Sequence, residues 1–537
     1  MASASVGGKR PPRLSRAWPL LGHLQELRKQ PIELFCRVRD ECGEIGEMNW
    51  AGTRVALLSG EEAQEAFYRA PDEQLDQAAA YPFMTPIFGR GVVFDGTAEQ
   101  RKAAMKNQSL RDKFMRGHAE TIEAEVRLAM EGLGDEGVID ILDFFSELTM
   151  YTSSACLVGK RFRTRLTSEV YRIFYTLEKG TDAIAYVNAD LPLPVFRERD
   201  RARRQLVERL TAMFEDLAHD EDAPRELFEI LLTLRDADGN PRYTIDQITG
   251  MFISLMFAGH HTTSGTAAWT LIEWLRNPRY LDRVQREIDG LYAQGRPVSY
   301  QALRESPVLE NGIKEALRLH PPLIVLMRKV VRDFHYKEWT VPAGDLVAVS
   351  PAVSNRMPEA FPAPDAYDPD RYAPGREEDK QLFAWTPFGA GRHRCVGAAF
   401  AMMQLKAIFQ TLLQRFTFEL VQPPASYRND HSKMVVQLAQ PCLVRYRRRE
   451  VAAVAPAAPA RTRDAEPEAP LRVAVDADLC QGHGVCVAEA PDVFALDRES
   501  NRVVLLQPEP APGSRAGARS AIRHCPTHAL RAREIEP

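Results

Sequence analysis

The sequence contains no uninterrupted apolar run long enough to serve as a signal peptide or to cross a membrane. It shows no excess of one charge, because 69 basic and 73 acidic residues leave a formal net charge of -4. Such a balance gives no reason to expect a nucleic acid or a membrane surface as a partner. No internal repeat of fixed period is visible either. These absences predict a soluble cytoplasmic protein without a transmembrane anchor.

The sequence also has no convincing G-x-G-x-x-G motif after a predicted strand, so it contains no recognisable flavin or nicotinamide module. Its length nevertheless exceeds the ~250–300 residues at which one hydrophobic core usually stops growing. A composition break occurs at VAAVAPAAPARTRDAEPEAP, an Ala/Pro-rich stretch without apolar periodicity. We therefore predict a large domain at residues 1–449, a linker at 450–470 and a small domain at 471–537.

The two domains have different predicted structures. Residues 1–449 are mostly helical by pattern, with strand-like runs at EIGEMNW, TRVALLSG, EWTVPAGDLVAVS and VVQLAQPCLVRYR. A long helical pattern spans about residues 246–276. The tail combines a strand-like LRVAVD, a hairpin-like VFALDRESNRVVLL and a helix near residues 513–523. The sequence thus predicts a mainly α domain with small β-sheets, followed by a small α+β domain.

One of the eight cysteines lies in a glycine-rich loop. Residues 387–400 read PFGAGRHRCVGAAF and precede a helical pattern. Glycines around Cys395 allow tight turns and a close approach of the backbone to a flat ligand, and a following helix N-terminus favours a thiolate. A thiolate in this setting can be the axial ligand of a haem iron. The alternative is a buried structural cysteine beside a turn.

Two further motifs precede this loop. In KEALRLHPP, Glu315 and Arg318 are one helical turn apart and can form an ion pair, although an ordinary solvated pair has the same spacing. The stretch DAYDPDRY then supplies Arg371. In this order, the three motifs resemble the cytochrome P450 family, in which such a glutamate and two arginines form a buried network behind the haem. The resemblance implies a mainly α cytochrome P450 fold, haem b as cofactor and Cys395 as the iron ligand.

The long central helix carries an unusual polar segment, FAGHHTTSG, at residues 257–265. Helical spacing puts Gly259 and Thr262 on one stripe, where a glycine would open space over a haem face and a threonine hydroxyl could hold water. Histidine suits proton delivery near neutral pH because its unperturbed pKa is ~6.5. The alternative is that His260 and His261 only pack within the helix or lie at the surface.

A histidine before the threonine, where the cytochrome P450 family usually has an acid, is similar to the sterol 14α-demethylases. Residues 81–95, YPFMTPIFGRGVVFD, resemble that family's segment between its B and C helices, and the resemblance covers nearly all of residues 15–449. It implies three successive oxidations of a sterol 14α-methyl group, ending in loss of formate and a 14,15 double bond. His261 and Thr262 are then the expected catalytic residues, with Glu178 as a candidate partner of His261.

The same resemblance implies two sets of binding residues. The haem propionates are expected to contact Tyr81, Lys102, Arg328 and His393, and cationic groups are physically suitable partners for carboxylates. The sterol pocket is expected to be lined by Tyr81, Phe83, Phe88, Phe257, Ala258, Leu323 and Met434. Phenylalanine at position 83 is similar to plant-type enzymes of the family, which favour sterols with one 4-methyl group.

The tail contains three cysteines, in LCQGHGVC and HCPTHAL. Cys480 and Cys486 bracket a loop with glycines, and Cys525 is followed by proline, which resembles small bacterial ferredoxins. His483 stands where a four-iron pattern would have its central cysteine. Three thiolates fit a 3Fe-4S cluster, while a 4Fe-4S cluster with His483 as fourth ligand and a zinc site are the alternatives.

A ferredoxin fused to a haem domain would supply electrons from the same chain, because the tether raises its effective concentration. Without a flavin or nicotinamide module, a separate NAD(P)H-dependent ferredoxin reductase is required, and dioxygen is the cosubstrate. The leading hypothesis is a self-tethered sterol 14α-demethylase acting on a lanosterol-type sterol. The alternatives are a haem-thiolate monooxygenase of another bulky lipid or terpenoid, and a haem and iron-sulfur redox sensor without turnover.

Overall fold

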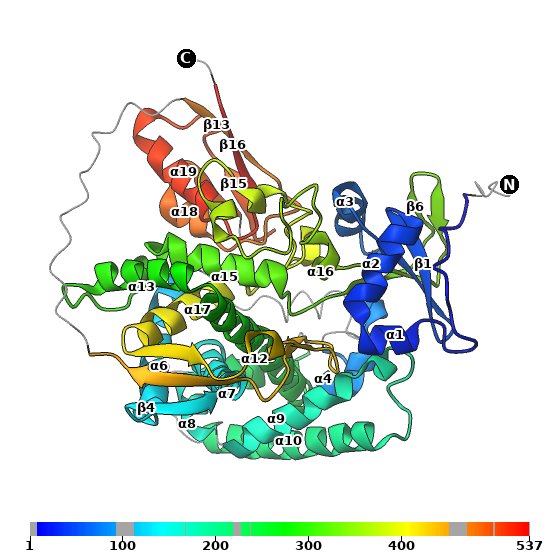
Figure 1. The fold of residues 1–537 in the computed structure, drawn as a ribbon, viewed down its shortest axis with the longest axis horizontal. Helices are drawn as coiled ribbons and strands as arrows, with labels where there is room; N and C mark the ends of the chain where they lie inside the picture. The colour runs from blue at the N-terminus through cyan, green and yellow to red at the C-terminus, as the bar shows by residue number, and fades with distance from the viewer. Residues whose placement is uncertain are drawn as a thin grey trace.

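The computed structural model describes residues 8–92, 112–166, 168–218, 227–236, 238–450, 470–497 and 500–535. They form a large, mainly helical body and a smaller C-terminal body that packs against it (Figure 1). The helices of the large body are α1 (Leu24–Lys29), α2 (Pro31–Cys42), α3 (Glu61–Arg69), α4 (Thr85–Phe88), α6 (Asp112–Glu131), α7 (Ile141–Ser153), α8 (Lys160–Arg165), α9 (Ser168–Glu178), α10 (Pro194–Ala218), α11 (Leu227–Thr233), α12 (Ile245–Arg276), α13 (Pro278–Tyr292), α14 (Tyr300–Arg304), α15 (Pro307–Leu319), α16 (Pro351–Ser354) and α17 (Ala398–Leu413).

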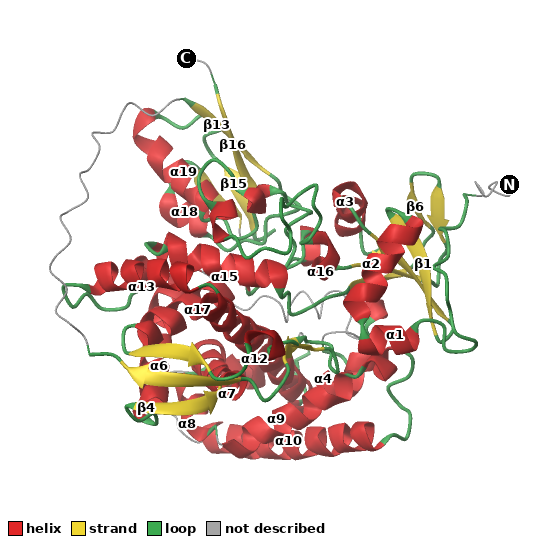
Figure 2. Ribbon diagram, in the orientation of Figure 1, coloured by secondary structure: helices red, strands yellow, loops and turns green. Residues whose placement is uncertain are grey.

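The sheets of the large body are small and lie at its periphery (Figure 2). The largest has the strand order β1–β2–β8–β5–β3, with β2 and β8 parallel and the other pairs antiparallel. Its strands are β1 (Ile45–Trp50), β2 (Thr53–Leu58), β3 (Leu75–Asp76), β5 (Leu326–Val330) and β8 (Leu346–Val349). The others are β4 (Glu136–Asp140), β9 (Phe416–Leu420) and β12 (Leu443–Arg448), then β6 (Phe334–Tyr336) with β7 (Trp339–Val341), and β10 (Asn429–Asp430) with β11 (Gln437–Leu438).

Helix α12 runs through the middle of the large body (Figure 1) and positions the polar segment at residues 257–265. It begins with a capping box, in which the Thr244 hydroxyl accepts from the Gln247 amide and the Gln247 side chain accepts from the Thr244 amide. Most of its side chains from Ile248 to Trp274 are buried. A helix buried on nearly every side has apolar residues all around rather than a single stripe. Its bounds agree with the helix predicted at 246–276.

The small body has its own core. Strand β13 (Leu471–Val475) pairs antiparallel with β16 (Leu530–Glu534), and β14 (Phe494–Asp497) and β15 (Arg502–Leu505) form the predicted hairpin. Its helices are α18 (Val485–Glu489) and α19 (Arg515–Arg523), the latter close to the helix predicted at 513–523. The buried side chains include Leu471, Val473, Cys486, Val493, Phe494, Ala518, Ala521 and Leu530.

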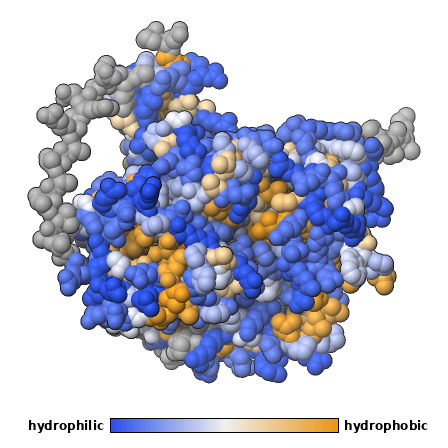
Figure 3. Space-filling model, viewed as in Figure 1, coloured by the Kyte–Doolittle hydropathy of each residue, from blue (hydrophilic) through white to orange (hydrophobic). Residues whose placement is uncertain are grey.

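Polar and charged side chains cover most of the face seen in Figure 3, with smaller apolar patches between them. Within the described part of the chain, no helix is both long and apolar enough to cross a membrane.

Candidate functional sites

The loop around Cys395 lies between a short 3-10 turn, η9 (Gly391–His393), and α17. Gly391 has a φ of +66°, and a β-carbon there would lie 2.4 Å from the Tyr68 carbonyl oxygen. The turn therefore requires glycine. The Cys395 amide donates to the Phe388 carbonyl at 2.9 Å. These contacts present the thiol just before the N-terminus of a largely buried helix, as the sequence predicted.

The Cys395 side chain is accessible, yet protein groups lie close enough to affect its ionisation. Desolvation raises the pKa of the thiol above its ordinary value, and the Gly397 backbone N–H and the Arg394 guanidinium offset part of that rise. Accessibility decides whether a metal can reach the sulfur, and the N–H and cationic neighbours favour the thiolate form that binds a metal. The loop therefore fits an iron ligand better than a buried structural cysteine.

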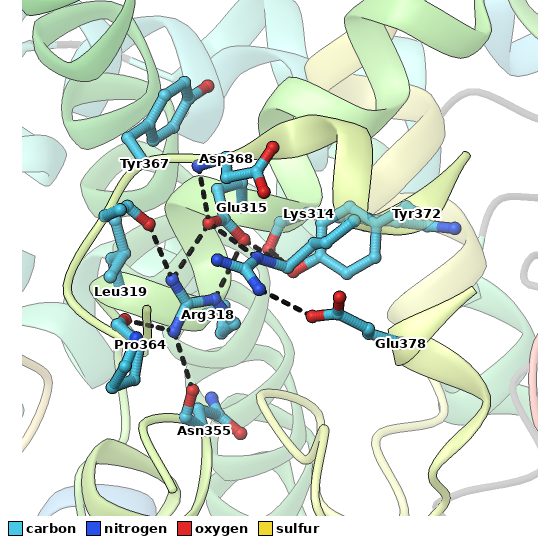
Figure 4. A network of polar contacts seen from close by, with 12 residues as sticks. Lys314, Glu315, Arg318, Leu319, Asn355, Pro364, Tyr367, Asp368, Tyr372 and Glu378 are labelled. Carbon is cyan, nitrogen blue, oxygen red and sulfur yellow. Dashed lines mark hydrogen bonds and ion pairs between the residues drawn. The ribbon is translucent and has the colours of Figure 1, made fainter. Parts of the chain in front are cut away.

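Glu315 and Arg318 of α15 and Arg371 of the turn η7 (Pro369–Tyr372) form a buried network (Figure 4). Arg318 donates two hydrogen bonds of 2.9 Å to the Glu315 carboxylate, and Arg371 donates one of 3.0 Å. The Tyr372 hydroxyl and the Asp368 amide also donate to this carboxylate, at 2.8 and 2.9 Å. All three ionic side chains are inaccessible to solvent, so the predicted network is present and the solvated-pair interpretation is wrong.

The middle of α12 contains an accessible position. Ala258 is exposed although Phe257 and His260 are buried, and Thr262, one turn later, is partly accessible and donates its hydroxyl to the Ala258 carbonyl at 2.7 Å. Gly259, expected on the same stripe, is a correction: a β-carbon there would contact Ser153 and Leu157 of the α7 region at 3.4 and 3.6 Å. These are ordinary van der Waals distances, so position 259 faces a neighbouring part of the protein rather than a ligand.

His261 and Glu178 are in contact inside the protein. His261 Nδ1 lies 3.3 Å from Glu178 Oε1, and the two side chains are 2% and 1% exposed. Lys433 Nζ lies 3.1 Å from the other carboxylate oxygen, Oε2. Burial, and then the charge of Lys433, lower the pKa of His261 to about 3, so its imidazole is neutral. Burial raises the pKa of Glu178, while Lys433 opposes that rise.

The second histidine faces a different neighbour. His260 Nδ1 lies 3.0 Å from the hydroxyl of Thr149 on α7, and the side chain is buried. Burial lowers the pKa of His260 well below its ordinary value. His260 therefore packs between two helices as a neutral ring, whereas His261 is paired with an acid.

Three of the four residues expected to hold the haem propionates cluster together. Arg328 is buried, its pKa is lowered to about 10 mainly by desolvation, and the Tyr81 hydroxyl is among the groups that affect it. His393 Nε2 lies 2.5 Å from Asp72 Oδ1. Burial opposes ionisation of Asp72, but its hydrogen bond with His393 and the charge of Arg328 lower its pKa overall. Cationic and hydroxyl groups thus converge where carboxylates could bind, and their role toward a haem stays a prediction. The fourth residue, Lys102, lies outside the described residues.

The residues expected to line the sterol pocket share one apolar region. The Phe88 and Phe257 rings lie 5.6 Å apart, and Phe257 lies 4.8 Å from the His261 ring. Phe83 lies 4.5 Å from Tyr186, which the sequence did not single out. Of the residues expected in the pocket, the apolar core cluster includes Tyr81, Phe83, Phe88 and Phe257, and Leu323 and Met434 pack against it. Ala258, which is exposed, does not belong to this cluster. An apolar wall therefore lies directly beside the buried acid–histidine pair.

The three tail cysteines lie close together. Desolvation raises the pKa of Cys486, and Cys525 and Cys480 raise it further. The Val503 amide donates to Cys480 Sγ at 3.4 Å, a contact that tunes cluster thiolates. Among the described residues, no group of three or more His, Cys, Asp and Glu side chains converges tightly enough to hold a metal ion.

The loop between Cys480 and Cys486 depends on its glycines. Gly482 has a φ of +71°, and a β-carbon there would lie 2.1 Å from the Asn501 carbonyl oxygen. Gly484, with a φ of +81°, is the N-cap residue that precedes α18. His483 lies between them and is partly buried, and its role as a fourth ligand stays a prediction. The backbone thus wraps closely around the region where the thiols gather.

The sequence matches the family "Cytochrome P450" over residues 12–445 and the family "4Fe-4S single cluster domain" over residues 473–532. The chain therefore belongs to the cytochrome P450 family, and its C-terminal domain is of the iron-sulfur type rather than a zinc site. Among solved structures, the retinoic acid-bound cyanobacterial CYP120A1 superposes with a TM-score of 0.73 at 20% identity, covering 82% of this chain and 100% of that one. This likeness shows the cytochrome P450 fold.

Two relatives of higher sequence identity narrow the class of cytochrome P450. A sterol 14α-demethylase from Mycolicibacterium vanbaalenii is 54% identical over 449 residues, covering 82% of this chain and 98% of the relative. An obtusifoliol 14α-demethylase from Sorghum bicolor is 34% identical, covering 83% of this chain and 92% of the relative. The haem domain therefore belongs to the sterol 14α-demethylase family, and the chain is a cytochrome P450 monooxygenase rather than a sensor without turnover.

Proposed function

We propose that this chain removes the 14α-methyl group of a lanosterol-type sterol in three oxidations, with release of formate and formation of a 14,15 double bond. The observation that carries the proposal is the buried His261–Glu178 pair, 3.3 Å apart, beside the aromatic wall of Phe88 and Phe257. An acid–base pair next to a large apolar surface suits repeated oxidation of a bulky lipid. The names of the relatives at 54% and 34% identity give the substrate class.

The residues present fit a haem, with Cys395 as the accessible thiol and Tyr81, Arg328 and His393 as partners for its carboxylates. The bound haem would supply dioxygen activation and oxygen insertion. Cys395 would donate electron density to the iron. The aromatic wall excludes water and orients the sterol, so that its methyl group rather than solvent meets the reacting centre.

His261 is placed to move protons. Its Nδ1 faces Glu178, while its Nε2 is buried without a hydrogen-bond partner among the described residues. A neutral imidazole can accept a proton at one nitrogen and release one from the other. Glu178 can hold that proton between transfers because burial raises its pKa. The Lys433 side chain, 11% exposed, links Glu178 toward the surface.

Electrons come from the iron-sulfur domain of the same chain. Cys480, Cys486 and Cys525 supply thiolates, and His483 occupies the remaining loop position, which favours a 3Fe-4S over a 4Fe-4S cluster. A separate NAD(P)H-dependent ferredoxin reductase reduces the iron-sulfur domain again after each transfer. Tethering keeps the donor near the haem domain at high effective concentration.

Reconstitution tests the proposal directly. The full-length protein is mixed with a ferredoxin reductase, NADPH and lanosterol, and the product is identified by mass spectrometry. We expect a high-spin shift of the Soret band on sterol binding and a 14-demethylated product with one formate. A Soret shift followed by a hydroxylated product without formate would instead favour a monooxygenase of another lipid.

Glu178→Ala tests the proton relay. Because the variant leaves His261 without its acid, we expect slower demethylation and more peroxide per NADPH consumed, with sterol binding unchanged. Glu169→Ala is the matched control, since Glu169 lies on the same helix and forms an ion pair with Arg209 at the surface. Normal turnover without extra peroxide in Glu178→Ala would remove Glu178 from the relay.

A further inference from the structure

The iron-sulfur domain meets the haem domain at the end that carries its cysteines. Gln481 follows Cys480, and its side-chain amide donates a 2.7 Å hydrogen bond to the Arg394 carbonyl oxygen. Arg394 in turn precedes Cys395. One hydrogen bond therefore joins the sequence neighbour of a cluster cysteine to the sequence neighbour of the haem cysteine.

A second contact lies at the end of α14. Arg304 places Nη1 2.6 Å from Glu489 Oε1 and Nη2 2.5 Å from His524 Nδ1. The Ser520 hydroxyl donates to the other oxygen of Glu489 at 2.5 Å, which holds that carboxylate in place. The Arg304 and Glu489 side chains are only 18% and 17% exposed, so solvent screens this pair less than an ordinary surface pair. His524 directly precedes Cys525.

A third contact extends the charge pattern. Arg69 Nη1 of α3 lies 3.6 Å from Asp476 Oδ2, four residues before Cys480. In both ion pairs the haem domain supplies the cation and the iron-sulfur domain supplies the anion. Complementary charges of this kind fix the orientation of two docked surfaces more than they add affinity.

Building on the proposed electron supply, we propose that Arg304 is the positioning residue that docks the iron-sulfur domain for electron transfer. We call the contacts of Arg304 with Glu489 and His524 the clasp. With the domain held by this clasp, the hydrogen bond between Gln481 and Arg394 directly connects the two cysteine loops. In each transfer one electron leaves the iron-sulfur domain, which is oxidised, and enters the haem domain, which is reduced. The ferredoxin reductase, oxidising NAD(P)H, replaces that electron.

Charge reversal tests the clasp in the full-length holoprotein. Arg304→Glu puts an anion against Glu489, and we expect roughly tenfold slower haem reduction in stopped-flow measurements under carbon monoxide. The double variant Arg304→Glu/Glu489→Arg should recover most of the rate. Arg209→Glu is the matched control, because it breaks a 2.7 Å ion pair with Glu169 inside the haem domain. An unchanged sterol-induced Soret shift shows that the haem domain is intact.

Hydrogen–deuterium exchange supplies a readout that needs no turnover. In the absence of reductase and sterol, exchange at residues 300–304 and 485–489 should rise in Arg304→Glu and return in the double variant. Gln481→Leu removes the hydrogen bond to Arg394 while leaving the clasp, so it should slow haem reduction without changing exchange at 300–304.

Three results would overturn the clasp. Exchange that rises in Arg304→Glu while the rate of haem reduction stays the same would show that electrons do not use this arrangement. Unchanged exchange in Arg304→Glu would show that Arg304 does not hold the domain. If the reductase reduces the cluster of the wild-type protein but its haem stays oxidised, the proposed electron supply fails and the clasp fails with it. This result needs only the wild-type protein, which distinguishes it from a failure of the clasp alone.

Discussion

At the scale of single residues, burial fixes the charge of the adjacent histidines of α12. The pKa of His261 is lowered to about 3 and that of His260 lies well below its ordinary value. In the unfolded chain both groups titrate near ~6.5. As the pH falls from about 6.5 toward 3, the unfolded state therefore binds protons that the folded state does not, and stability is lost.

Each such histidine contributes a slope of up to about 1.4 kcal/mol per pH unit in this window. His261→Gln should remove one of these contributions and flatten the loss of stability on acidification. Urea unfolding at several pH values measures the slope, with His431→Gln, a less enclosed histidine, as a comparison. An identical slope in wild type and His261→Gln would mean that His261 does not resist protonation in the folded protein.

Phe83 is one of the buried aromatic residues of the apolar region beside His261. Its ring lies edge-on to Tyr186 with the centroids 4.5 Å apart, and a leucine would remove that contact. We expect Phe83→Leu to raise turnover of 4,4-dimethyl sterols relative to 4-monomethyl sterols in competition assays. Phe409→Leu is the control, because Phe409 is buried in a different core cluster. The same ratio of rates in wild type and Phe83→Leu would refute this role.

The local geometry around some single residues could be predicted from the sequence. Cys395 has a glycine-rich loop around it, and its setting follows from local geometry that the sequence specifies. Gly259 was misplaced because helical spacing gives the direction of a residue but not which neighbour it meets. Lys433 and Tyr186 were missed because distant segments bring them to Glu178 and Phe83.

At the scale of elements, the glycines of the cluster loop allow a matched test. Gly482→Ala would place a β-carbon 2.1 Å from the Asn501 carbonyl, whereas Gly484→Ala meets nothing within 4 Å. Both positions have positive φ, so an alanine costs about 1 kcal/mol of backbone strain at either one. Gly484→Ala has only this cost, whereas Gly482→Ala adds the clash with Asn501. We expect Gly482→Ala to lose iron and the EPR signal of the cluster, while Gly484→Ala retains most of both. Equal iron content in the two variants would show that the loop relaxes.

The buried network between α15 and η7 is the second test at this scale. Glu315→Gln removes the anion that Arg318 and Arg371 share in a region closed to solvent. Arg371 keeps its ion pair with Glu378, whereas Arg318 loses its paired carboxylate. The expected loss is about 3–5 kcal/mol in the free energy of unfolding. Glu169→Gln, which removes an exposed ion pair, should cost about 0–1 kcal/mol. Similar losses in denaturant titrations of the two variants would contradict the network's structural role.

Elements with a strong local pattern were predicted well. The central helix, the β1 and β2 strands and the β14–β15 hairpin follow from apolar periodicity and turn residues. Strand β16 was not predicted, because in its LRARE sequence only Leu530 is buried and the rest is exposed. Its pairing with β13, across most of the small domain, is a long-range contact that local propensity does not encode.

At the scale of the whole molecule, two domains with separate cores are in direct contact with each other. The family matches end at residue 445 and begin again at 473, on either side of the composition break that predicted the linker. The contacts of Arg304 and Gln481 with the opposite domain were not predicted, because charged and amide side chains of this kind look like ordinary surface residues in a sequence. The arrangement supports a chain in which donor and catalyst work as a unit.

The most direct test of the central claim is release of labelled formate from a sterol carrying 13C in its 14α-methyl group. The wild-type chain, with ferredoxin reductase and NADPH as the only other components, should release one labelled formate per 14,15-unsaturated sterol. A Cys480→Ser/Cys525→Ser variant should bind the sterol but release formate only when a separate ferredoxin is added. Formate at the wild-type rate from that variant without added ferredoxin, or no labelled formate from the wild type, would contradict a self-supplied sterol 14α-demethylase.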